Sequence, residues 1–120
     1  EECNFKGFKE FIQKGKIVIL KMNIAEYKNL SKIIAAYLKL DFQTEVLSNL
    51  AKNNCNRTVA FISDEYHEYV TSTDADFFAQ SREAKCINIV ATQSYTSLLK
   101  TLNNDNLMYH NYIKKKRKSQ

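Results

Sequence analysis

Two adjacent acids, Asp64 and Glu65, directly follow an apolar run at residues 58–63 (TVAFIS). If this run forms a buried strand, it delivers both carboxylates to one end of a sheet. There the first acid could hold a hydrated Mg²⁺ ion on nucleotide phosphates, and the second could orient or deprotonate an attacking water. Asp64 is therefore the candidate metal and nucleotide ligand, and Glu65 is the candidate catalytic carboxylate. The alternative is that a strand simply ends in solvent at two acids.

Two further side chains are candidates for the same site, and a nearby histidine is not. Gln93 follows the apolar run at residues 86–92 (CINIVAT), where its carboxamide could touch a γ-phosphate or the attacking water. Arg82 could point into a subunit interface and stabilise transition-state charge, although an exposed helical arginine is usually only solvated. His67 is expected to pack the loop after the strand rather than to do chemistry.

A parallel sheet is needed to bring these side chains together. Its predicted strands are residues 16–22 (KIVILKM), 58–63 and 86–92. Because the first two runs lack polar alternation, they predict strands that are buried on both faces. Helical patterns separate the runs, so the chain reads as two consecutive βαβ units. The predicted fold class is α/β, with a parallel sheet of about three strands, flanking helices and ligands at the carboxyl ends of the strands.

A long amphipathic helix is predicted from Ala25 to Leu50, with a bend near Asp41. Its apolar stripe is expected to pack in the core, and its lysines are expected to face solvent. The stripe comprises Leu30, Ile33, Ile34, Tyr37 and Leu38, and the lysines are Lys28, Lys32 and Lys39. We also expect a short helix over residues 74–85, capped by Asp74, and a last helix capped by Ser94.

The net charge of +5 is concentrated in one short segment. The chain has 18 basic and 13 acidic residues, and residues 114–118 supply five of the basic ones, so 13 basic residues remain against 13 acidic ones. A basic tail can hold phosphates by counterion release, although such a tail is more often only solvated. We expect residues 1–102 to form the folded unit and residues 103–120 to form a polar to basic, flexible tail.

The cysteines and the hydropathy indicate a protein of a reducing cytoplasm. Cys3, Cys55 and Cys86 are odd in number and lack metal-ligand spacing, so a disulfide framework or zinc site is not expected. The sequence contains no signal peptide and no apolar run of about 18 residues that would span a membrane.

Three blocks of sequence occur in an order and spacing that match a known family: residues 61–70 (FISDEYHEYV), 76–83 (DFFAQSRE) and 89–94 (IVATQS). Together they resemble the nucleotide-binding domain of TraG/TraD-type coupling proteins, the conjugative ATPases of type IV secretion systems. The resemblance extends from about Gly15 to Leu102. It implies a RecA-like P-loop NTPase core that hydrolyses ATP with Mg²⁺ between the subunits of a homo-hexameric ring. It also implies single-stranded DNA, a relaxase complex and the secretion channel as partners.

Four residues match functional positions of that family. Asp64 and Glu65 match its Walker B acids, Gln93 matches the glutamine of its Gln-Ser block, and Arg82 matches its Ser-Arg element. The resemblance implies that Asp64 and Gln93 contact nucleotide, that Asp64 serves the metal, and that Glu65, Gln93 and Arg82 are catalytic.

The sequence also departs from the family pattern, because it has no phosphate-binding loop. Gly15-Lys16 is followed by Ile17 rather than by Ser or Thr, and no further strand is evident after Leu102. We therefore expect the Walker B half of a motor ATPase, inactive by itself. The alternatives are a non-catalytic α/β module that binds the transfer machinery or DNA, and a small α/β protein whose acidic pair binds a metal ion or nothing.

Overall fold

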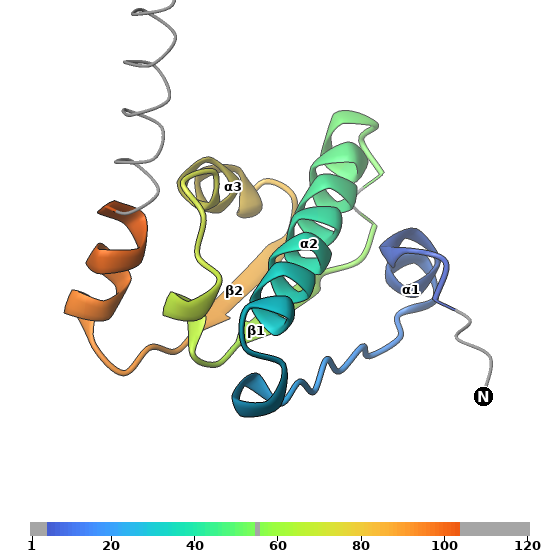
Figure 1. Cartoon of the computed structure of the whole chain (residues 1–120). Coiled ribbons are helices and arrows are strands. Elements are labelled where there is room, and N and C mark those ends of the chain that lie inside the picture. The colour runs from blue at the N-terminus through green and yellow to red at the C-terminus, as the bar shows by residue number, and fades with distance from the viewer. Residues whose placement is uncertain (1–4, 55, 104–120) are drawn as a thin grey trace, which may run out of the picture.

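The structure is a computed structural model that describes residues 5–54 and 56–103 of the chain. It is a mixed α/β arrangement (Figure 1). Its elements, in chain order, are α1 (Phe8–Lys14), α2 (Ile24–Ala51), β1 (Val59–Ser63), the 3-10 turn η1 (Tyr66–Glu68), α3 (Asp74–Ser81), β2 (Cys86–Val90) and helical residues 95–103. None of the helices in this described part combines the length and the apolar character that crossing a bilayer requires. The predicted tail lies, from residue 104 onward, outside the described residues.

The sheet confirms two of the predicted strands and their parallel direction. β1 pairs with β2 from Val59 opposite Cys86 to Ser63 opposite Val90. α3 lies between the two strands in the chain, as the predicted βαβ order requires. Because the strands are parallel, the residues that follow β1 and β2 emerge at the same edge of the sheet.

The prediction of a first strand at residues 16–22 is wrong. The sheet of the described residues has two strands rather than about three, and residues 16–23 form no helix or strand. The side chains of Ile17 and Ile19 are 87% and 84% exposed. A run of β-branched residues becomes a buried strand only when a neighbour pairs with its backbone and a second layer covers it. Here neither partner is provided by the described residues.

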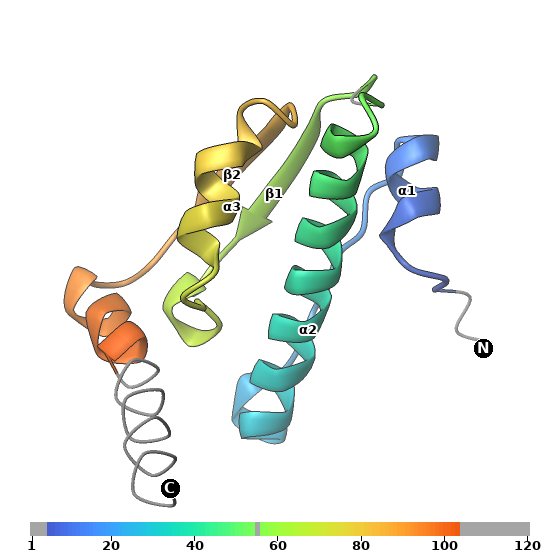
Figure 2. The same cartoon turned by 90° about the horizontal axis from the view of Figure 1, so that it is seen from above.

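The core lies on one face of the sheet, where α1, α2 and α3 pack (Figure 2). It comprises Phe42, Val46, Phe77, Ala84 and Cys86, with Val59 and Phe61 of β1 packed against it. The opposite face is open, since Ile62, Ile87 and Ile89 are each more than half exposed. The expectation that β1 is buried on both faces is therefore wrong within the described residues, whose helices cover only one side.

The long helix forms as predicted, but a different face of it is buried. Leu30, Ile33 and Tyr37 are 55%, 65% and 69% exposed, whereas Lys39, expected in solvent, is buried. Figure 2 shows the reason: the first half of α2 extends beyond the ends of β1 and β2, so the strands leave part of its apolar stripe uncovered, while the rest of the stripe is partly buried. The backbone irregularity lies at Lys28, with φ 43°, rather than near Asp41.

Of the two predicted helix caps, one is confirmed and the other is wrong. Ser94 caps the last helix, because its Oγ accepts a hydrogen bond of 3.1 Å from the Ser97 backbone N–H. Asp74, by contrast, is the first residue of α3, and Thr73 occupies the capping position without a side-chain cap bond. The carboxylate of Asp74 is buried instead in a polar cluster described below.

Candidate functional site

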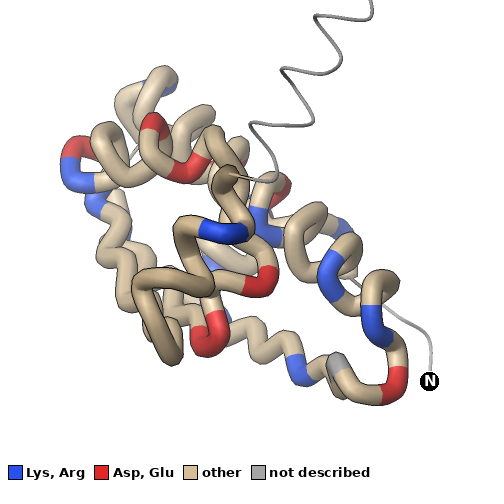
Figure 3. The backbone as a smooth tube through the Cα atoms, turned by 60° about the vertical axis from the view of Figure 1, so that its left-hand side comes forward, with Lys and Arg blue, Asp and Glu red and all other residues tan. Residues whose placement is uncertain are grey.

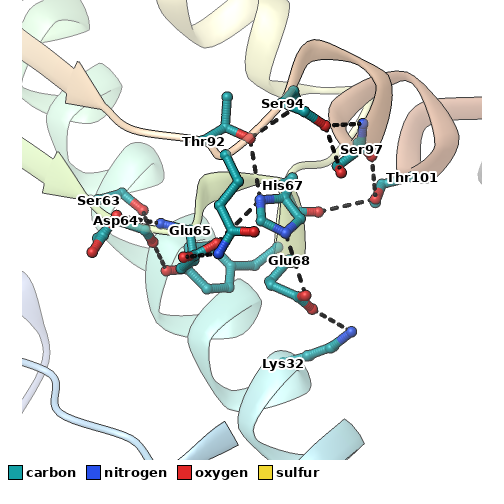
Figure 4. Close-up of polar contacts among 12 residues, drawn as sticks. Lys32, Ser63, Asp64, Glu65, His67, Glu68, Thr92, Ser94, Ser97 and Thr101 are labelled. Carbon is teal, nitrogen blue, oxygen red and sulfur yellow. Dashed lines mark hydrogen bonds and ion pairs between the residues drawn. The ribbon is translucent and has the colours of Figure 1, made fainter.

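Two of the predicted site residues meet at the carboxyl edge of the sheet, in the network of Figure 4. Gln93 donates a hydrogen bond from Nε2 to Oε1 of Glu65, with the two atoms 2.7 Å apart. Backbone bonds beyond the strands bring the two loops together: Ala91 N–H donates to Ser63 C=O at 2.8 Å, and Tyr66 N–H donates to Ala91 C=O at 2.9 Å. The parallel pairing thus continues past β1 and β2 and fixes the glutamate beside the carboxamide.

Glu65 occupies the left-handed backbone region, with φ 50° and ψ 39°. This conformation is unfavourable for a residue with a Cβ atom, so neighbouring contacts must hold it. Asp64 Oδ1 accepts a hydrogen bond of 2.9 Å from the Glu65 N–H, and the Tyr69 hydroxyl donates to the Asp64 carbonyl. The turn reverses the chain after β1 and leaves the Asp64 side chain exposed at the edge of the sheet.

His67 links the acids of this loop to the loop after β2. Its Nδ1 lies 3.1 Å from Thr92 Oγ1 and 3.5 Å from Glu65 Oε2, and its Nε2 lies 3.4 Å from Glu68 Oε1. Glu68 in turn pairs with Lys32 of α2. The ring is 14% exposed, so it packs the loop as expected and also connects two carboxylates. Local sequence patterns carry no signal for these contacts, because 25 positions separate His67 from Thr92.

A buried ion pair lies beneath the acidic loop and was missed by sequence reasoning. Lys39 Nζ lies 2.6 Å from Asp74 Oδ2 and donates to the Tyr69 carbonyl at 2.7 Å. Gln43 Nε2 donates to Asp74 Oδ1 at 3.0 Å, and the Tyr66 hydroxyl donates to Asp74 Oδ2. Lys39 and Asp74 are only 4% and 2% exposed. A buried charge needs such partners, because leaving water otherwise costs several kcal/mol.

The cluster changes the acidity of two of its members. Burial by itself raises the pKa of Asp74, but the hydrogen bonds from Lys39, Tyr66, Gln43 and the Thr71 N–H outweigh it and leave that pKa below its ordinary value. Burial, and next the hydrogen bond to Asp74, raise the pKa of the Tyr66 phenol. Asp74 is therefore held as a carboxylate and Tyr66 as its neutral donor.

Arg82 lies apart from the other predicted site residues. It is exposed and follows the last residue of α3, where the chain turns into the amino end of β2. Glu65 and Gln93 follow the carboxyl ends of the strands. The five residues of β2 separate the two ends, and at about 3.3 Å per residue this is roughly 15 Å. Arg82 instead lines an open groove beside β2 with Phe78, Lys85 and Asn88.

Charge of both signs is interspersed over the described chain (Figure 3). Lysine and arginine positions and aspartate and glutamate positions all occur along this part of the backbone. The basic run at residues 114–118, on which the expectation of nucleic-acid binding depends, lies outside the described residues.

Comparison of the chain with models of protein families, with curated proteins and with solved structures finds no match. The functional argument therefore depends on the site itself. The strand ends bring Glu65 and Gln93 into contact and place Asp64 beside them, whereas Arg82 lies at the other end of the strands.

Proposed function

We propose that this chain is the Walker B half of a RecA-like motor ATPase, which in its complete form couples ATP hydrolysis to DNA transfer through a type IV secretion system. One observation carries the proposal: Gln93 and Glu65 are hydrogen-bonded across the ends of two adjacent parallel strands. An ATPase of this class needs a carboxylate and a reporter amide side by side at that edge, where an open α/β sheet binds its ligands.

In this proposal Glu65 accepts a proton from the attacking water. Gln93 holds one carboxylate oxygen at 2.7 Å, which fixes the direction in which the carboxylate faces the water. His67 lies 3.5 Å from the second oxygen, so both oxygens of the proposed base have a neighbouring polar group. When nucleotide is cleaved, any movement of Glu65 is transmitted through Gln93 to the loop that begins the last helix.

Asp64 is the proposed magnesium ligand of this site. Its carboxylate is exposed, and oxygen donors are those that Mg²⁺ prefers. In the described residues no group of three or more His, Cys, Asp or Glu side chains could hold a metal ion. One carboxylate is nevertheless sufficient for an ion that keeps several waters and binds nucleotide phosphates. The bound ion would neutralise phosphate charge, and Asp64 would orient its hydration shell.

Arg82 is proposed to act on the nucleotide site of a neighbouring subunit rather than on the site of its own subunit. It is exposed and lies roughly 15 Å of strand away from the acidic edge, by the strand rise used above. In a homo-hexameric ring each nucleotide site lies between two subunits, so an arginine at one end of the sheet could reach the site of the next subunit. The relaxase complex, single-stranded DNA and a cytoplasmic location are part of the same proposal.

A non-catalytic binding module is the second candidate, and the open sheet face favours it. Ile62 is 72% exposed, and Ile87 and Ile89 are 53% and 54% exposed on the same side of the sheet. An apolar surface of this kind suits a protein partner better than DNA, whose backbone is charged. The two candidates differ in whether Glu65 matters for turnover.

The test joins this chain to a P-loop half of a RecA-like domain and compares three variants with the parent. Glu65→Gln should bind ATP but lower single-turnover hydrolysis by about a hundredfold or more, because it removes the base and keeps the shape. Asp64→Asn should weaken nucleotide binding only when Mg²⁺ is present. Gln93→Ala should retain nucleotide and slow hydrolysis to a smaller extent. Glu83→Gln, an exposed acid beyond α3, is the matched control.

Near-normal hydrolysis in Glu65→Gln would refute the Walker B assignment and favour the binding module. Loss of hydrolysis together with all nucleotide binding would indicate misfolding, so each variant is also checked for cooperative unfolding.

A further inference from the structure

We infer that Asp74 is a positioning residue for Glu65: through Tyr66 it holds the turn that directs Glu65 at Gln93. The geometric part of this inference depends only on contacts within the chain. Its consequence for hydrolysis depends on the proposed function.

The first step is that Tyr66 is fixed at both of its ends. Its backbone N–H donates to the Ala91 carbonyl at 2.9 Å, which ties it to the loop after β2. Its hydroxyl donates to Asp74 Oδ2, which ties it to the buried cluster. The side chain is 3% exposed, so it has no room to turn away. Since Tyr66 directly follows Glu65, these two anchors fix the chain on one side of the glutamate.

The other side of Glu65 is connected to the same ion pair. The Tyr69 hydroxyl donates to the carbonyl of Asp64, the residue before Glu65. The Tyr69 carbonyl in turn accepts a hydrogen bond of 2.7 Å from Lys39, whose ammonium group binds Asp74. Both flanks of the glutamate are therefore held by one pair of buried charges.

Such anchoring is what the backbone of Glu65 requires. At φ 50° it lies in a region that a non-glycine residue leaves unless its surroundings over-determine the conformation. If the anchors loosen, the turn relaxes toward ordinary backbone angles and the Glu65 carboxylate moves away from Gln93. Whether Glu65 stays in contact with Gln93 therefore shows whether the buried cluster around Asp74 holds the turn after β1.

Asp74 is itself rigid enough for this role. Gln43 donates to its Oδ1 at 3.0 Å and Lys39 to its Oδ2 at 2.6 Å, and both belong to the long helix α2. The Thr71 N–H, at 3.0 Å, adds a bond from the segment before α3. A carboxylate with this many donors keeps one orientation, so the Tyr66 hydroxyl finds its acceptor in a fixed place.

The competing interpretation is that the cluster only stabilises the fold. Both interpretations predict that Tyr66→Phe lowers stability, because it removes a buried hydrogen bond. They differ in the folded state, where only a positioning role changes the contact between Glu65 and Gln93.

The experiment is an NMR comparison of the full chain in the folded state. The chemical shifts of the Gln93 side-chain amide are recorded for the parent and for Glu65→Ala. The second variant gives the chemical shifts that the amide has when its hydrogen bond to Glu65 is absent. Tyr66→Phe keeps the ring and removes only the hydroxyl. We expect it to move the Gln93 resonances toward the Glu65→Ala position, and Asp74→Asn to move them in the same direction. Tyr95→Phe, at a tyrosine that is 72% exposed, is the matched control and should leave them unchanged.

Two results would overturn the inference. One is that the Gln93 resonances in Tyr66→Phe stay at the parent position while the unfolding midpoint falls, which would mean that the cluster is merely structural. The other is that Glu65→Ala does not move them, so that the contact to be positioned does not exist. If Asp74→Asn does not fold, Tyr66→Phe still decides the question.

Neither result requires nucleotide, so failure of this inference is distinguishable from failure of the ATPase proposal. In a protein joined to a P-loop half, Tyr66→Phe should lower kcat by about tenfold with little change in nucleotide affinity.

Discussion

The side-chain amide of Gln93 donates a hydrogen bond to the carboxylate of Glu65 across the ends of two parallel strands, with Nε2 and Oε1 2.7 Å apart. The two residues are 28 positions apart in the chain, and only the pairing of β1 with β2 brings them together. In the proposed function Glu65 is the base and Gln93 is the carboxamide that orients it. What they lack for nucleotide chemistry is a loop of backbone N–H groups to hold phosphates.

The chain alone should not hydrolyse ATP measurably. The sequence contains no phosphate-binding loop, and two carboxylates repel phosphates rather than cradle them. Steady-state phosphate release by purified chain should therefore equal that of Glu65→Gln. Phosphate release by the parent that exceeds the release by this variant would show that the chain by itself binds and hydrolyses nucleotide, which contradicts the prediction.

Replacing Lys39 with Met should destabilise the fold by about 3–5 kcal/mol, because the carboxylate of Asp74 would remain buried without its cation. Urea unfolding measures the loss. Lys9→Met is the matched control at an exposed lysine of α1, and should change the free energy of unfolding by at most about 0.5 kcal/mol. Equal effects at the two positions would contradict the burial of the ion pair.

Stability should fall in acid through Asp74. Its pKa is lowered in the folded chain from the ordinary value of 3.8, so the unfolded chain takes up the proton more readily. The stabilisation is fully present above pH 3.8 and is lost as the pH falls through the lower folded pKa. Unfolding free energies measured between neutral pH and strong acid should show this loss in the parent. A variant Asp74→Asn should be less stable at neutral pH and should lose less on acidification.

Two aromatic residues on α2 distinguish the buried face of the helix from its exposed face. Phe42→Ala should cost about 3–5 kcal/mol, since Phe42 is 7% exposed and belongs to the core. Tyr37→Ala should change stability by no more than about 0.5 kcal/mol, since Tyr37 is 69% exposed. Thermal or urea unfolding of both variants is the measurement. A large loss at Tyr37 would mean that the apolar stripe of α2 is covered in solution.

The sequence by itself determined several of the local elements, although it predicted no helix at Phe8–Lys14 and a strand at residues 16–22 that does not form. The runs of β-branched residues at 58–63 and 86–92 predicted β1 and β2, and the helical spacing from Ala25 to Leu50 predicted α2. These features depend on neighbours a few positions apart, so periodicity reveals them. The parallel order followed from the alternation of strands and helices. From it came the expectation that Glu65 and Gln93 emerge at one edge.

Only the tertiary structure decided which surfaces are buried and which distant groups meet. Residues 16–22 have the composition of a strand, yet the described residues give them no paired neighbour or covering layer, and they remain exposed. The helical spacing of the apolar stripe predicts that Lys39 faces solvent. Lys39 is buried because Asp74, 35 positions away, supplies the opposite charge. Burial and pairing depend on how the helices pack on the sheet. They are therefore set by contacts between residues that are far apart in the sequence, and no single segment predicts them.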